Sequence, residues 1–252
     1  LTFDQARDDS PFVELPGGAK GRNPFKDVRV RQAVYQAIDA QLIIQKVLRG
    51  NGRMTGTFIS PLVDGYVKEL DQRLPYDPKA ARRLLAEAGY PNGFTVQLDC
   101  VNVKFRESAC QAIAAMLTQV GIKTELQVAP SATFFPKLTQ GAASMIEYGW
   151  TPSVDPWLTF NGLWRSFDGK GSGAFNAGRY SNPKLDALVD AMRVEPDLAK
   201  RRAIVADALR VLHADLPFVP LYRRGIGWVM RPTVHVSMWP SDTMELRWVR
   251  VD

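Results

Sequence analysis

The stretch FTVQLDCVNVKFRESACQAIAAMLTQVGIKTELQV, residues 94–128, decides the fold class of this 252-residue chain. Residues 94–100 alternate apolar and polar side chains, which predicts a strand. From about residue 106 to residue 120 the apolar side chains recur at helical spacing, and Gly121 stops the pattern. Alternation returns over residues 122–128. Strand, helix and strand in this order form a βαβ unit, so we expect two parallel strands joined by a right-handed crossover.

Helix and strand signals on both sides extend this unit into an α/β domain. Polar caps before apolar stripes predict helices that start after Asp27, Asp77 and Asp197, and one capped by Ser181 or Asn182 with Pro183 in its first turn. Asp39 either interrupts the first of these helices or caps another one. We also expect a short helix over 131–139 and strands over 143–150, 218–222, 226–230 and 244–251. The order predicts one mixed sheet with flanking helices on both faces. Residues 151–181 show no clear periodicity, which is typical of a functional loop.

Composition narrows the class of protein. The chain is 46% hydrophobic and 23% charged, which indicates a globular protein, and no apolar run approaches the length of a membrane-spanning helix. The net charge of +6 permits nucleic-acid binding, but Lys and Arg are spread along the chain without interleaved aromatic residues. We therefore expect no nucleic-acid partner. A basic nucleic-acid-binding module stays as an alternative that the salt dependence of binding would reveal.

Catalytic and cofactor motifs are missing from the sequence. Two isolated histidines and two cysteines give no zinc spacing, and neither a GxSxG elbow nor a phosphate-binding loop occurs. We expect no enzyme activity, no cofactor and no metal. An α/β hydrolase-like enzyme is the other alternative; it would need a nucleophile and a base, and replacing Ser172 or Asp155 would then abolish turnover.

Cys100 and Cys110 are the two thiols of the chain. One ends the first strand of the βαβ unit, and the other lies on the apolar face of the following helix. Since consecutive elements of such a unit pack together, the sulfurs could reach bonding distance, but two buried free thiols fit the pattern equally well. A disulfide bond would point to an oxidising compartment.

Several ordered blocks of the sequence resemble the family 5 extracellular solute-binding proteins, the dipeptide-, oligopeptide- and nickel-type receptors of ABC importers. The resemblance extends over about residues 23–252. Its blocks are NPFKDVRVRQAVYQAID (23–39), YDPKAARRLLAEAG (76–89), Gly149-Trp150 with Asp155-Pro156, YSNPKLD (180–186), and LPFVPLY (216–222). The block at 23–39 also places Arg29 and Arg31 on the polar side of a helix, where Arg31 could form a local ion pair.

The resemblance implies a periplasmic-binding-protein-like lobe. Members of the family are about twice this long, with two lobes that enclose a ligand, so we expect the C-terminal half. Residues 1–22 would be an irregular segment near the hinge, residues 23–230 the second lobe, and residues 231–252 a tail that completes the missing first lobe. No signal-peptide pattern and no initiator Met occur, which fits a start that has been removed. The implied partners are a small solute, with a peptide as one candidate, an ABC permease in the inner membrane, and the missing N-terminal lobe. The implied location is the periplasm.

Two loops carry the candidate ligand-binding residues. The loop after residues 94–100 holds Lys104, Phe105 and Arg106, and the resemblance implies that a basic residue there can pair with a ligand carboxylate. A solvated loop is the alternative. The other candidates follow the third strand, where open α/β sheets bind ligands; they are Tyr148, Trp150, Thr151, Ser153 and Asp155.

Trp150 would offer an aromatic wall with one N–H donor, although it would suit a core equally well. Peptide receptors of this family carry an aspartate three residues after this Trp, where it binds the α-amino group of the peptide. This chain has Ser153 there, preceded by Pro152. Asp155 could substitute, but in the family the Asp of this Asp-Pro pair is mainly structural. The departure weakens the expectation of a peptide with a free amino terminus.

Overall fold

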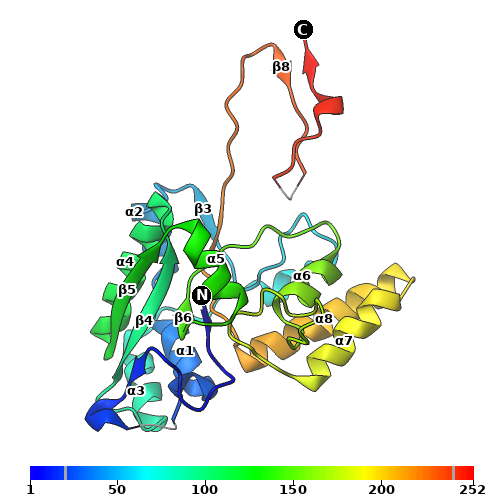
Figure 1. Cartoon of the computed structure of the whole chain (residues 1–252). Helices are drawn as coiled ribbons and strands as arrows, with labels where there is room; N and C mark the ends of the chain where they lie inside the picture. Colours follow the sequence, from blue (N-terminus) through cyan, green and yellow to red (C-terminus); the bar gives the residue numbers. More distant parts are fainter. Residues whose placement is uncertain (20–21, 240–241) are drawn as a thin grey trace.

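The computed structural model describes residues 1–19, 22–239 and 242–252. Strand β4 (Phe94–Val101) lies at the centre of a five-stranded mixed sheet (Figure 1). Strand β5 (Ile122–Ala129) runs parallel to β4 along its whole length, with Phe94 opposite Ile122 and Val101 opposite Ala129. Helix α4 (Lys104–Gln119) connects the two strands, which confirms the predicted βαβ unit.

The other edge of β4 is shared by two short strands. Strand β6 (Met145–Ile146) is parallel to it, and β2 (Val13–Glu14) is antiparallel. Strand β1 (Thr2–Phe3) pairs with β6. The expectation of an irregular N-terminal segment is therefore wrong for these residues. The reason is burial, because the ring of Phe3 is fully buried and stacks on Phe25 at a centroid distance of 5.0 Å.

The predicted helices form, the caps expected at Asp27, Asp77 and Asp197 are present, and the structure selects Asn182 and Asp39 as caps where the sequence left alternatives. Asp27, Asp39, Asp77, Asn182 and Asp197 each accept a hydrogen bond from a backbone N–H of the first turn. The helices besides α4 are α1 (Val28–Ala37), α2 (Ala40–Lys46), α3 (Pro78–Glu87), α5 (Ser131–Thr139), α6 (Pro156–Leu163), α7 (Pro183–Val194) and α8 (Leu198–Asp215), with short 3-10 turns at Pro16–Gly18, Pro24–Lys26, Lys68–Leu70 and Leu246–Trp248. Among the described residues, no helix has the length and apolar character needed to cross a membrane.

Three apolar clusters fill the interior. The largest lies between the sheet and α1, α3 and α4, and a small one lies under α5. A third, built from α6, α7, α8 and residues 58–67, forms the half of the lobe drawn on the right of Figure 1. The N-terminal residues lie beside the segment that follows α8. The Val219 N–H donates to the Leu1 carbonyl at 2.7 Å, and Thr2 Oγ1 donates to the Pro217 carbonyl at 3.1 Å.

Several predicted strands are shorter than expected. The third strand is only β6, because the chain leaves the sheet after Glu147, whose N–H still donates to the Asp99 carbonyl. Residues 151–181 contain α6, which the mixed aromatic and proline content of the segment concealed. Strand β7 (Tyr222–Arg224) replaces the two expected at 218–222 and 226–230, and it pairs with β3 (Gly52–Met54). The last expected strand shrinks to β9 (Arg250–Val251).

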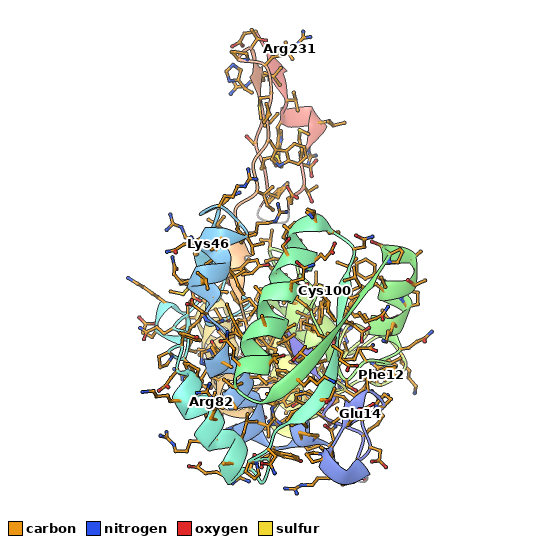
Figure 2. The ribbon with its side chains drawn as sticks, turned by 90° about the vertical axis from the view of Figure 1, so that its left-hand side faces the viewer. Phe12, Glu14, Lys46, Arg82, Cys100 and Arg231 are labelled. Carbon is orange, nitrogen blue, oxygen red and sulfur yellow. A yellow bond between two sulfur atoms is a disulfide. The ribbon has the colours of Figure 1, made fainter. Side chains whose placement is uncertain are left out.

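The tail after β7 leaves the body of the molecule. Strand β8 (Val234–His235) pairs antiparallel with β9, and this ribbon stands clear of the sheet in Figures 1 and 2. Its apolar side chains are exposed: Val229 is 102% exposed and Leu246 is 77% exposed. Trp239 and Trp248 contact each other at 5.6 Å between ring centroids. Such a large unshielded apolar surface is typical of a segment that docks elsewhere.

Arg31 corrects the expectation of an arginine on the polar side of its helix with a local ion pair. It is 7% exposed, and its guanidinium donates hydrogen bonds to the carbonyls of Phe25, Asp215 and Leu216 at 2.6–3.1 Å. Two of these carbonyls lie at the end of α8, where Leu216 adopts a left-handed conformation with φ of 46°. Arg31 therefore caps a helix that is distant in sequence, and helical periodicity cannot reveal such a partner.

Replacing Arg31 with methionine should lower the free energy of unfolding by about 2 kcal/mol, since it leaves buried carbonyls without donors. Urea denaturation followed by circular dichroism would measure the loss. Arg29→Met is the matched control on the same helix, because Arg29 is exposed and pairs mainly with its neighbour Asp27. An Arg31 variant as stable as the Arg29 variant would contradict this role.

Candidate functional site

A cavity of about 360 Å³ opens between the two halves of the lobe. Three groups of residues far apart in sequence form most of its lining: 55–60, then 105–106 with 147–152, and 218–226; Leu1, Thr2, Leu163 and Trp164 complete it. The second group comes from the start of α4 and from the chain after β6, that is, from the carboxyl ends of the parallel strands. Open α/β sheets bind ligands at this end.

Aromatic side chains form one wall of the cavity. The Tyr148 hydroxyl donates to the Phe175 carbonyl at 3.1 Å, and burial raises the pKa of this phenol. The indole N–H of Trp150 donates to Thr159 Oγ1 at 3.1 Å, and the ring lies 5.2 Å from that of Phe175. Both predicted residues line the cavity with their polar atoms already bonded, so they offer ring surface rather than hydrogen bonds.

A buried ion pair forms part of the cavity wall. Arg106 Nη1 lies 2.9 Å from Glu147 Oε1 and 3.0 Å from Oε2, and Glu147 is only 4% exposed. The guanidinium packs against Gly149, where the Cβ of any other residue would collide with it. Arg106 therefore reaches the cavity as predicted, but its charge is largely satisfied within the protein.

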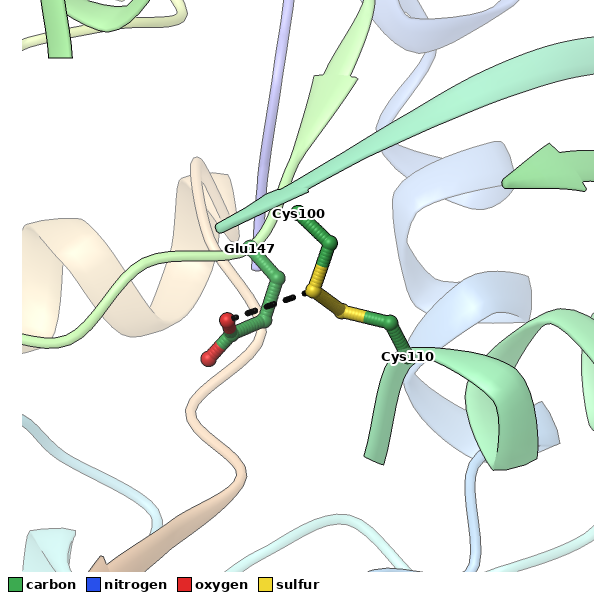
Figure 3. A group of neighbouring side chains, drawn as sticks. All are labelled: Cys100, Cys110 and Glu147. Carbon is green, nitrogen blue, oxygen red and sulfur yellow. Dashed lines mark hydrogen bonds between the residues drawn. A yellow bond between two sulfur atoms is a disulfide. The ribbon is translucent and has the colours of Figure 1, made fainter. Parts of the chain in front are cut away.

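The two cysteines lie directly behind this ion pair. Cys100 and Cys110 are both fully buried and form a disulfide bond that ties the end of β4 to α4 (Figures 2 and 3). Glu147 Oε2 lies 3.9 Å from Cys100 Sγ. Such a cluster of two sulfurs and a carboxylate can resemble a metal site. Because both sulfurs are in the disulfide, no thiolate is left to bind a metal. The disulfide instead packs against the Arg106–Glu147 ion pair.

A second arginine that lines the cavity also forms an ion pair within the protein. Arg223 forms an ion pair with Asp71, which accepts further hydrogen bonds from Thr55 Oγ1 at 2.7 Å and from Tyr66 Oη at 2.8 Å. Burial opposes ionisation of Asp71, but these hydrogen bonds prevail and lower its pKa below the usual value. Asp71 thus joins β7 to the segment that carries Thr55.

The remaining predicted residues divide into two groups. Phe105 and Thr151 line the cavity, whereas Lys104, Ser153 and Asp155 do not. Asp155 caps α6 by accepting the Trp157 N–H at 2.8 Å, and it also pairs with Arg201 Nη2 at 2.6 Å. Asp155 thus stabilises the start of α6 and its contact with Arg201. This agrees with the structural role that the resemblance implies for the Asp of the Asp-Pro pair.

Sequence reasoning missed the cavity residues at 55–60 and 218–226. Pairing of β3 with β7 brings these segments together, and neither three-residue strand has a readable period. A weak signal was available in the row of polar and aromatic residues from Thr55 to Ser60, which lies between two predicted helices and has no helical pattern of its own.

Replacing Asp155 with alanine should lower the free energy of unfolding by about 1 kcal/mol, because it removes an N-cap. It should leave the affinity for any ligand of the cavity unchanged, since the side chain lies outside the cavity. Chemical denaturation and ligand titration of the same variant test both parts. Asp197→Ala, which removes the cap of α8, is the matched control. A clear loss of affinity specific to Asp155→Ala would place this carboxylate in the binding site after all.

The architecture and the cavity define a class of protein. An α/β lobe with a mixed sheet and an aromatic cavity at the carboxyl ends of its parallel strands has the architecture of an open α/β ligand-binding fold. Residues 3–172 match the bacterial extracellular solute-binding proteins, family 5 (middle region), and the chain belongs to this family.

Individual relatives agree with this assignment. Heme-binding protein A of Haemophilus influenzae is 30% identical over 205 residues, which cover 79% of this chain and 37% of that protein. The dipeptide-binding protein of Escherichia coli K12 is 27% identical over 244 residues, covering 88% of this chain and 45% of that protein. The chain thus spans less than half the length of these curated relatives.

Solved structures show the same fold. The dipeptide-binding protein of Pseudoalteromonas sp. SM9913, in complex with Met-Leu, superposes with a TM-score of 0.78 at 24% identity, covering 92% of this chain and 46% of that one. The periplasmic binding protein DppA of Helicobacter pylori, in complex with the peptide STSA, gives a TM-score of 0.77 at 22% identity, covering 97% of this chain and 48% of that one.

Proposed function

We propose that this chain forms one wall of the ligand cleft in a two-lobe solute-binding protein, which captures a small solute and delivers it to an ABC permease in the inner membrane. The observation that carries the proposal is the cavity, which opens between segments 55–60, 147–152 and 218–226 at the carboxyl ends of the parallel strands. Capture would be non-covalent, with the solute stabilising the closed arrangement of the lobes.

The domain arrangement is part of this proposal. Residues 23–230 act as the second lobe, residues 1–22 lie near the hinge, and residues 231–252 complete the sheet of the first lobe. The exposed tail supports this arrangement, since β8 and β9 pair only with each other among the described residues and their apolar side chains lack cover. The half-length match to the relatives supports it too.

Binding rather than catalysis suits the residues of the site. Ser172 lies in a turn whose N–H groups bind Asp168, and it does not line the cavity. The Nε2 atom of His213 is buried without a hydrogen-bond partner. Neither group offers a nucleophile paired with a base. A periplasmic location fits the family and the disulfide bond.

The experiment is a thermal-shift screen of the proposed two-lobe protein against di- and tripeptides, small carboxylic acids and polyamines. We expect a solute that raises the melting temperature, because it binds only the native state. The 252-residue chain alone should bind the same solute far more weakly, since it contributes one wall. Equal affinity of both proteins, or hydrolysis that depends on Ser172, would contradict the proposal.

A further inference from the structure

One guanidinium at the cavity has no acidic partner among the described residues. Arg224 is exposed, lines the cavity, and lies with its Cζ 4.8 Å from the centre of the Phe105 ring. The other two arginines of the cavity form ion pairs: Arg106 with Glu147, and Arg223 with Asp71. Arg224 therefore contributes a positive charge that the protein does not neutralise nearby.

The local structure leaves this side chain free to meet a ligand. In the β3–β7 pair, Arg224 lies opposite Gly52, which has no side chain to cover it. Phe105 supports the guanidinium from one face. An arginine stacked on an aromatic ring keeps its planar row of N–H donors available, and that row matches the two oxygens of a carboxylate.

The cavity has no comparable group for a cation. Glu147 is the one carboxylate among the described lining residues, it is buried, and both of its oxygens bind Arg106. The neighbouring positions hold aromatic rings, hydroxyls and backbone. An ammonium group entering here would lose water and meet Arg224 without gaining a counter-charge, which is unfavourable.

We propose that this wall of the cleft selects solutes that carry a carboxylate or a similar anionic group on an apolar body, that Arg224 binds the anion, and that this wall offers no site for a free ammonium group. This inference rests on the proposed function and names the class of solute.

The test uses three probes with one aromatic body and different charge: 3-phenylpropionate, 3-phenylpropanol and 3-phenylpropylamine. Each is titrated into the ¹⁵N-labelled 252-residue chain while the backbone and arginine Nε–H signals are followed by NMR. We expect 3-phenylpropionate to shift the signals of Arg224 and Phe105 and to bind at least about tenfold more tightly than the amine, as expected for one charge-assisted pair. Arg224→Gln should remove this preference.

The matched control is Arg53→Gln, which removes a neighbouring charge on β3 from a residue outside the cavity lining. It should keep the preference. Equal binding of acid and amine, or an unchanged preference in Arg224→Gln, would overturn the inference and leave the proposed function standing. Shifts for none of the three probes at the cavity residues would also overturn the inference, whereas the thermal-shift screen of the two-lobe protein tests the proposed function separately.

Discussion

Replacing Arg106 with methionine is expected to lower the free energy of unfolding by about 3–5 kcal/mol at neutral pH, because it leaves the Glu147 carboxylate buried without its counter-ion. Glu147 is 4% exposed, and both of its oxygens lie within 3.0 Å of Arg106 Nη1. Urea denaturation of the two proteins, followed by circular dichroism, measures the difference.

The double variant Arg106→Met/Glu147→Leu is the control for this prediction. A buried ion pair replaced by apolar residues of similar volume is commonly close to neutral, so the double variant should recover most of the lost stability. If the single variant were as stable as the wild type, Glu147 would have to reach water by another route. The pair would then not belong to the rigid wall of the cavity.

Removal of the disulfide is the second large effect. Cys100→Ala/Cys110→Ala should lower the free energy of unfolding by about 2–3 kcal/mol, since a bridge that spans 10 positions limits the freedom of the unfolded chain only moderately. The wild type in a thiol reductant should approach the variant, whereas the variant should not respond to reductant. Denaturation curves with and without reductant provide the measurement. Curves that coincide for all four samples would show that the bridge does not form.

The disulfide also links stability to the cleft. Cys100, the last residue but one of β4, lies beside Glu147 (Figure 3), and Cys110 lies on α4 one turn after Arg106. The bridge therefore ties together the two elements that flank the ion pair. We therefore expect the double cysteine variant to bind solute more weakly as well. The sequence left a disulfide and two free thiols equally open, because spacing alone does not set the angle at which a helix meets a strand.

Local signals predicted the parts of the fold that short-range interactions decide. The βαβ unit over residues 94–128 and the helix starts at Asp27, Asp77 and Asp197 depend on periodicity and capping within one turn, and all are present. Strand β1 and helix α6 were missed for a different reason. Two residues cannot display a period, and Pro156 with its aromatic neighbours resembles a loop.

Of the candidate ligand-binding residues, those that directly follow strand ends are mostly the ones that line the cavity. Phe105, Arg106, Tyr148, Trp150 and Thr151 follow strands of the parallel unit, and they line the cavity. The sequence could not predict which arginines of the cavity are ion-paired, because their acidic partners lie far away in the sequence. Glu147 satisfies Arg106, Asp71 satisfies Arg223, and Arg224 is left without an acid among the described residues.

The central claim is that this chain provides one wall of an interlobe cleft, and hydrogen–deuterium exchange of the proposed two-lobe protein tests it most directly. The comparison is made with and without the solute found in the thermal-shift screen. We predict solute-dependent protection at residues 55–60, 105–106, 147–152 and 218–226, together with constant protection of the tail at 231–252. Solute-dependent protection confined to other faces of the lobe, with a tail that exchanges freely, would contradict the claim.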